Sequence, residues 1–194
     1  MGAIFSSLGR TIVAGLVILV VIMLIAGTFG HAGEMDWWRF FIRWLHVLSG
    51  VMWIGILWYF NFVQTPSMPK IPDEQKPAIS KVIAPTALFW FRWGAAATVL
   101  TGAILATMNN YIVQALSLQK PFTAIGIGMW LGLVMAFNVW FIIWPNQKKA
   151  LGIVQVSPEE KAAAAKRAGM TSRINTMLSI PMLFMMVAQQ NGGL

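Results

Sequence analysis

Residues 11–30 read TIVAGLVILVVIMLIAGTFG, an apolar stretch without a charged side chain. An α-helix rises about 1.5 Å per residue, so about 20 residues span the ~30 Å hydrocarbon core of a bilayer. Inside lipid, backbone polar groups must be paired within the segment, and a stretch of this length therefore predicts a transmembrane helix. It is longer than the apolar core of a signal peptide, which has about 7–15 residues, and we interpret it as a membrane anchor.

Four further apolar blocks follow along the chain. The five predicted spans are residues 11–30, 38–63, 86–108, 122–144 and 174–188. The fold class is therefore all-α, a polytopic transmembrane helical bundle of about five spans. We treat residues 1–194 as a single integral membrane domain.

The segments between these spans are polar. Residues 64–85 contain five prolines and five charges, so we expect a solvent-exposed loop that cannot continue a helix. We also expect the fourth span to stop at Pro145. The motif SPEE at 157–160 has a helix-capping serine, a proline and two acidic residues, which predicts a short polar or amphipathic cytoplasmic helix there.

Composition and charge limit the class of partner. Hydrophobic residues make up 58% of the chain and charged residues 10%, against about 25% charged in a soluble domain. The net charge is +8, but the basic residues form no surface stripe, so we expect the lipid bilayer as partner and no nucleic acid. Cysteine is absent, which excludes disulfides, thiolate metal sites and covalent c-type haem attachment.

The basic residues also predict an orientation. Arg10, the three lysines of residues 64–85 and the six basic residues of 146–173 all fall on one side of the predicted bundle. By the positive-inside rule, the amino terminus is cytoplasmic and the carboxyl terminus periplasmic.

His46 is the candidate functional residue of the second span. It lies roughly 12 Å along the helix from the outer end, where an ionisable side chain is costly unless it is used. Ser49 and Gly50 follow at i+3 and i+4, so small residues flank the imidazole and leave room for a flat macrocycle. Arg43 lies one turn toward the outer surface, where it would meet a haem propionate.

Two interpretations of His46 remain open. In the first it is an axial iron ligand of a b-type haem, and in the second it is a packed histidine that hydrogen-bonds a neighbouring helix. A haem held by two histidines would need His31, which lies in a loop on the same outer side. A methionine ligand is an alternative, but none of the 13 methionines stands out.

Other polar and small residues within the spans have structural interpretations. We expect Asn138 and Asn175 to hydrogen-bond across helices, and Gly128 with Gly132 to form a close-packing face. For Arg92 we expect a membrane anchor that stacks on tryptophan.

Four segments resemble one known family in the same order. They are DWWRFFIRWLHVLSGVMWIG (36–55), ALFWFRWGAAATVLTG (87–102), WPNQKKAL (144–151) and RINTMLSIPMLFMMVAQQN (173–191). They resemble the membrane domain of bacterial membrane-bound urate hydroxylase, the urate oxidase N-terminal domain family. The resemblance covers about residues 36–190 and implies a multi-pass protein of the bacterial cytoplasmic (inner) membrane.

The resemblance also implies a redox function. Members continue into a cytochrome c domain, whereas this chain has no cysteine, so we expect a stand-alone form that passes electrons to a separate cytochrome or respiratory complex. Of the family's membrane-domain histidines only His46 is present, and Ala87, Phe89 and Ile174 stand at positions that look equivalent to others. The expected function is a b-type haem electron-transfer subunit related to a membrane oxidoreductase. The alternative is a non-catalytic accessory or assembly subunit of a membrane complex.

Overall fold

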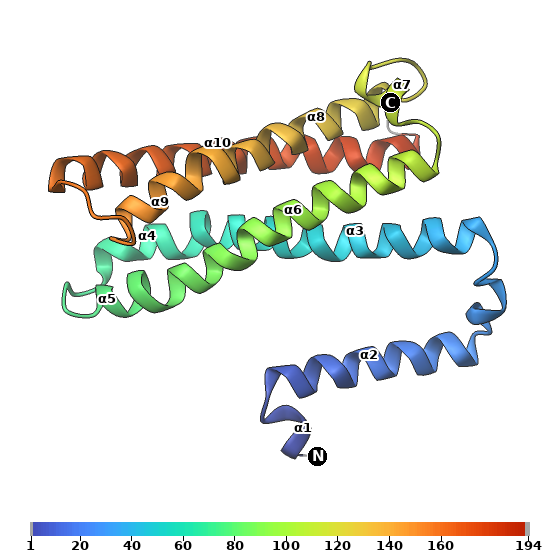
Figure 1. Ribbon diagram of the computed structural model, residues 1–194, viewed down its shortest axis with the longest axis horizontal. Helices are drawn as coiled ribbons and strands as arrows, with labels where there is room; N and C mark the ends of the chain where they lie inside the picture. Colours follow the sequence, from blue (N-terminus) through green and yellow to red (C-terminus); the bar gives the residue numbers. More distant parts are fainter. Residues whose placement is uncertain (1, 193–194) are drawn as a thin grey trace. The chain divides into compact units, whose positions relative to one another are not determined.

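The computed structural model describes residues 2–192, and these residues form helices and connecting turns without a strand. They fall into two compact units, one up to Phe41 and one from Ile42. The α-helices, labelled in Figure 1, are α1 (Gly2–Phe5), α2 (Leu8–Ile25), α3 (Met35–Trp58), α4 (Thr65–Ser67), α5 (Lys76–Ala78), α6 (Ala84–Met108), α7 (Ile112–Leu116), α8 (Thr123–Phe137), α9 (Trp144–Ala150) and α10 (Pro158–Asn191).

The prediction of an all-α membrane protein is confirmed. Within the described residues, four continuous helical stretches are long and apolar enough to cross a bilayer, Leu8–Ile25, Met35–Lys70, Lys76–Met108 and Thr123–Ala150. The fifth predicted span, residues 174–188, lies inside α10. It stays a prediction because no segment of α10 is both long and apolar enough to join these four.

In the first unit, α2 is apolar on all sides beyond Arg10 and Thr11 and buries none of its side chains, which is typical of a helix that contacts lipid. This helix ends at Ile25 rather than at the predicted Gly30. The cause is Gly27, whose φ of 68° lies in the left-handed region, a conformation that ends helices at little cost when glycine adopts it.

The expected proline-rich loop is largely helical, so the prediction that residues 64–85 cannot continue a helix was wrong. π-Helical segments at Tyr59–Gln64, Ile79–Ile83 and Asn138–Ile143 each lead directly into a short helix or helical stretch with proline in its first turn. A proline ring clashes with the carbonyl four residues earlier, and a π-helical turn widens the backbone just where that clash would occur.

The helix therefore also continues through Pro145 to Ala150, and the predicted stop at Pro145 was wrong. Only residues 71–75, between Lys70 and Lys76, separate the two apolar helices on either side of the proline-rich segment.

In the second unit, α3, α6, α8 with α9, and α10 lie side by side as a bundle (Figure 1). Their shared core centres on Trp53, Leu57, Phe91, Met135 and Val139, each at most 1% exposed. The short helices α4 and α5, the end of α9 and the start of α10 lie at one end of the bundle, and α7 lies at the other (Figure 1). The lysines of residues 64–85 and most basic residues of 146–173 are thus gathered at one end.

The predicted polar helix and the fifth span are one continuous helix, α10. Ser157 caps it as expected, since its Oγ accepts a hydrogen bond from the backbone N–H of Glu160 at 3.2 Å. The helix passes through Pro181 without a break. The residues around this proline, such as Ser179 and Met182, are held in the core by neighbouring helices, which is how membrane helices tolerate proline.

The half-buried Asn138 and the fully buried Asn175 bond across helices as predicted. Asn138 Nδ2 donates to Asn175 Oδ1 at 2.8 Å, and Asn175 Nδ2 donates to the Met135 carbonyl at 2.9 Å. The same face of α10 accepts a hydrogen bond from the Trp58 indole through Ser179 Oγ at 3.0 Å. These bonds fix the rotation of α10 against α3 and α8, because each side chain would be left unpaired in an apolar core if the helix turned.

Candidate functional site

His46 lies on α3 and faces α6. Its Nδ1 is 2.9 Å from the backbone carbonyl oxygen of Thr98 and 3.2 Å from Thr101 Oγ1. His46 therefore hydrogen-bonds a neighbouring helix, as the second interpretation expected. This bond does not use the other ring nitrogen, so the ligand interpretation remains open.

The Thr98 bond defines the tautomer of the imidazole. A carbonyl oxygen only accepts, so Nδ1 carries the proton and donates, and in the neutral ring Nε2 then holds a lone pair. Among the described residues Nε2 has no hydrogen-bond partner. Histidines that ligate metals use this arrangement, with one nitrogen on the metal and the other N–H on a carbonyl, carboxylate or water.

A glycine of α6 makes room for the ring. A Cβ on Gly102 would lie 2.8 Å from His46 Cε1 and 3.2 Å from Nδ1, closer than a side chain tolerates. A Cβ on Gly50 would meet only the Thr98 methyl carbon, at 3.9 Å, which is an ordinary van der Waals contact. The close fit of the imidazole thus depends on Gly102, and the predicted role of Gly50 in leaving room for a macrocycle stays a prediction.

Arg43 and Tyr111 lie near one another at the end of the bundle where α7 lies. The Nε of Arg43 is buried without a hydrogen-bond partner in the described residues. Burial raises the pKa of the Tyr111 phenol above its usual value, and the positive charge of Arg43 opposes this only in part. Tyr111 is therefore a neutral phenol at physiological pH.

His31 belongs to the first unit and is exposed. Its Nδ1 lies 2.9 Å from Glu34 Oε1, and the two side chains are 66% and 63% exposed. The proposed pairing of His31 with His46 on one haem stays a prediction.

Sequence reasoning missed the α6 side of this site. Thr98, Thr101 and Gly102 repeat at i, i+3 and i+4 on the third span, a spacing that places them on one helical face. The pattern was visible in the sequence, but which helix would face it was not, since helix pairing depends on the whole bundle. Tyr111 was also missed, because it lies in the segment between α6 and α7 and its neighbours depend on how the bundle packs.

The tautomer of His46 is directly testable. With only two histidines in the chain, ¹⁵N-histidine NMR of the detergent-solubilised protein should show the Nδ1–H tautomer at His46, with His31→Ala used for assignment. Gly102→Ala should abolish this signal pattern, because the added methyl group displaces the ring from the Thr98 carbonyl. Gly50→Ala is the matched control and should preserve it, and loss of the pattern in both variants would contradict the assigned contact.

Comparison with known proteins finds a family match in the carboxyl-terminal part of the chain. The family model described as urate oxidase N-terminal matches residues 107–192. The match covers α7, α8, α9 and α10, and leaves α3 and His46 outside. No curated protein and no solved structure matches the chain.

Proposed function

We propose that this membrane protein, whose residues 107–192 match the urate oxidase N-terminal family model, is a b-type haem subunit that carries electrons to a separate partner. The observation that supports the proposal most is the setting of His46. Its Nδ1–H is held by the Thr98 carbonyl at 2.9 Å, and its Nε2 has no partner in the described part of the chain.

The residues present suit a haem in two respects. His46 offers Nε2 as a ligand while the hydrogen bond from its Nδ1–H to the Thr98 carbonyl fixes the orientation of the ring, which favours iron ligation. Arg43 has a buried Nε without a hydrogen-bond partner among residues 2–192, and a propionate is the kind of anion that would satisfy it. When bound, a b-type haem supplies one-electron oxidation and reduction.

The chain's own residues then have defined tasks. His46 would bind the iron, while Thr98 keeps its ring from rotating and Gly102 allows the ring to lie against α6. Arg43 would pair with a propionate, and the neutral Tyr111 phenol nearby offers a hydrogen-bond donor without adding charge. His31 would be the candidate for a second histidine ligand.

We place the protein in the bacterial cytoplasmic membrane, with the amino terminus in the cytoplasm and the carboxyl terminus in the periplasm. The support is the collection of basic residues at the end of the bundle with α4, α5 and the α9–α10 connection, together with the positive-inside rule. The haem site would then lie toward the periplasmic half, and the electron partner would be a cytochrome or respiratory complex there.

A reduced-minus-oxidised visible spectrum tests the proposal. We expect the detergent-purified protein, expressed with ample haem supply, to show b-type bands, and pyridine-haem quantification to give about one haem per chain, the number that one site predicts. A haem-free protein under these conditions would contradict the proposal and favour the accessory-subunit alternative. With haem present, urate would be the first reductant to test.

A further inference from the structure

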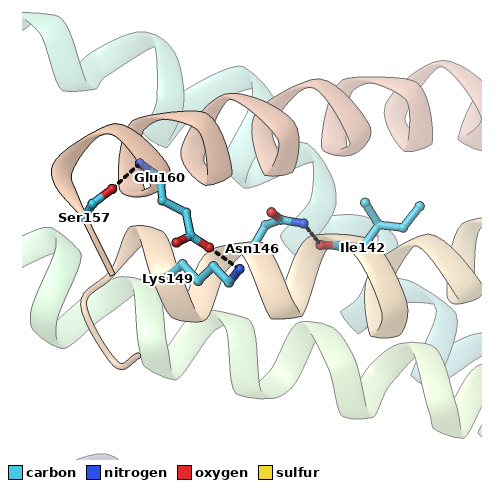
Figure 2. A network of polar contacts seen from close by, with 5 residues as sticks. All are labelled: Ile142, Asn146, Lys149, Ser157 and Glu160. Atoms are coloured by element: carbon cyan, nitrogen blue, oxygen red, sulfur yellow. Dashed lines mark hydrogen bonds and ion pairs between the residues drawn. The ribbon is translucent and has the colours of Figure 1, made fainter. Parts of the chain in front are cut away.

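A pocket lies where α9 meets the start of α10, in the second unit. It has a volume of about 150 Å³ and is lined by Asn146, Lys149, Glu160, Ala163, Ala164 and Arg167. Figure 2 shows the polar residues on its α9 side, with Asn146 Nδ2 donating to the Ile142 carbonyl at 2.7 Å. Side chains from two helices thus build a defined cavity rather than a flat charged surface.

The pocket is basic. Lys149 Nζ lies 2.6 Å from Glu160 Oε1 (Figure 2), so these two charges compensate one another. Arg167 is exposed, and within the described residues its guanidinium has no ion-pair or hydrogen-bond partner. One uncompensated cation therefore faces the cavity. Lys161 and Lys166 on the same helix add to the positive potential, and Glu159 in its first turn offsets one of them.

The depth of the pocket corresponds to the membrane–water boundary. Lys149 is in the last turn of the apolar stretch Thr123–Ala150. One turn deeper, the Arg92 guanidinium carbon lies 3.3 Å from the centre of the Trp144 ring, and Lys148 Nζ lies 5.7 Å from it. Tryptophan and basic side chains mark the interfacial layer of membrane proteins.

We propose that this pocket binds a phosphate group, carried by an anionic phospholipid or present as the free ion. Arginine pairs with phosphate through two parallel N–H donors, and lysine adds a point charge. Basic pockets between membrane helices at this depth suit lipid headgroups. The cavity has room for a phosphate group, whose oxygens would lie against Arg167 while Lys149 stays paired with Glu160. The proposal does not depend on haem.

Lipid titration of the full-length, delipidated protein tests the site. Short-chain phosphatidylglycerol is added in detergent, and bound lipid is counted by native mass spectrometry. In a second arm, inorganic phosphate is added at constant ionic strength, and the melting temperature is followed. Saturation with the lipid alone identifies a headgroup site, and saturation with both identifies a site for the phosphate ion itself.

Three variants separate a built site from general surface charge. Arg167→Gln should weaken binding and raise the dissociation constant about tenfold, the effect of one lost charge-assisted hydrogen bond. Lys166→Gln removes the same charge from the neighbouring position outside the pocket and should change the dissociation constant by less than about twofold. Glu160→Gln should tighten binding, a gain that a folding defect cannot mimic. Equal weakening by Arg167→Gln and Lys166→Gln, or no saturable binding of either ligand, would overturn the proposal.

Discussion

Replacing His46 by alanine is expected to remove the haem from the purified protein and to abolish most of its pyridine-haem signal, because the iron would lose a protein ligand. The variant should still insert and fold. The substitution removes one hydrogen bond to the Thr98 carbonyl, and side-chain hydrogen bonds between membrane helices contribute on average only about 0.6 kcal/mol. The measurement is the reduced-minus-oxidised spectrum of wild type and variant at matched protein concentration.

Added imidazole provides the matched control for this substitution. The cavity left beside Gly102 keeps the Thr98 carbonyl that held the ring, so free imidazole should bind there and restore part of the haem signal. A His31→Ala variant tests the second ligand separately, because loss of that ligand alone should change the band positions while haem is retained. A haem spectrum unchanged in His46→Ala would rule out the axial role of His46.

The membrane helices could be predicted from sequence because hydrophobic length alone requires them. An apolar stretch such as residues 11–30 has no stable alternative in lipid, whatever its neighbours are. The ends of the helices were less predictable. The prolines of residues 64–85 were expected to form a loop and Pro145 to end the fourth span, and the structure instead accommodates Pro66, Pro85 and Pro145 through π-helical turns. Such a turn depends on packing around the proline, which local sequence does not contain.

Of the candidate site, His46 could be predicted from the sequence, but its partners on α6 could not. His46 stood out because an imidazole is costly in lipid, and that argument needs only one helix. Its partners Thr98 and Gly102 come from a helix about 50 residues later, and the same spacing of small residues also occurs on other spans. Gly50, chosen because it is close to His46 along α3, contacts Thr98 only loosely. The contact surface of a helix follows from the pairing of helices, which one sequence does not specify.

The glycines of α8 allow a second large effect to be predicted. On Gly126, a Cβ would overlap the carbonyl oxygen of Ala115 and lie 2.9 Å from its carbonyl carbon. On Gly128, the nearest atoms would be Met185 Cβ at 3.2 Å and the Met186 backbone nitrogen at 3.3 Å. On Gly132, nothing lies within 4 Å. The expected close-packing face therefore includes Gly128, whereas the tightest approach is at Gly126.

Alanine substitutions at these positions should follow that order. Gly126→Ala forces α7 away from α8, because Ala115 is fully buried and its backbone cannot yield as a side chain would. We expect a loss of about 3 kcal/mol or more, at the upper end of overpacking costs. Gly132→Ala should be neutral or stabilising by up to about 1 kcal/mol, since alanine favours the helix, and Gly128→Ala should fall between the two.

The free energy of unfolding in mixed detergent and dodecyl sulfate micelles measures all three. Equal stability of Gly126→Ala and Gly132→Ala would show that α7 does not pack on α8 through this glycine, because the two substitutions differ only in what the added methyl group meets.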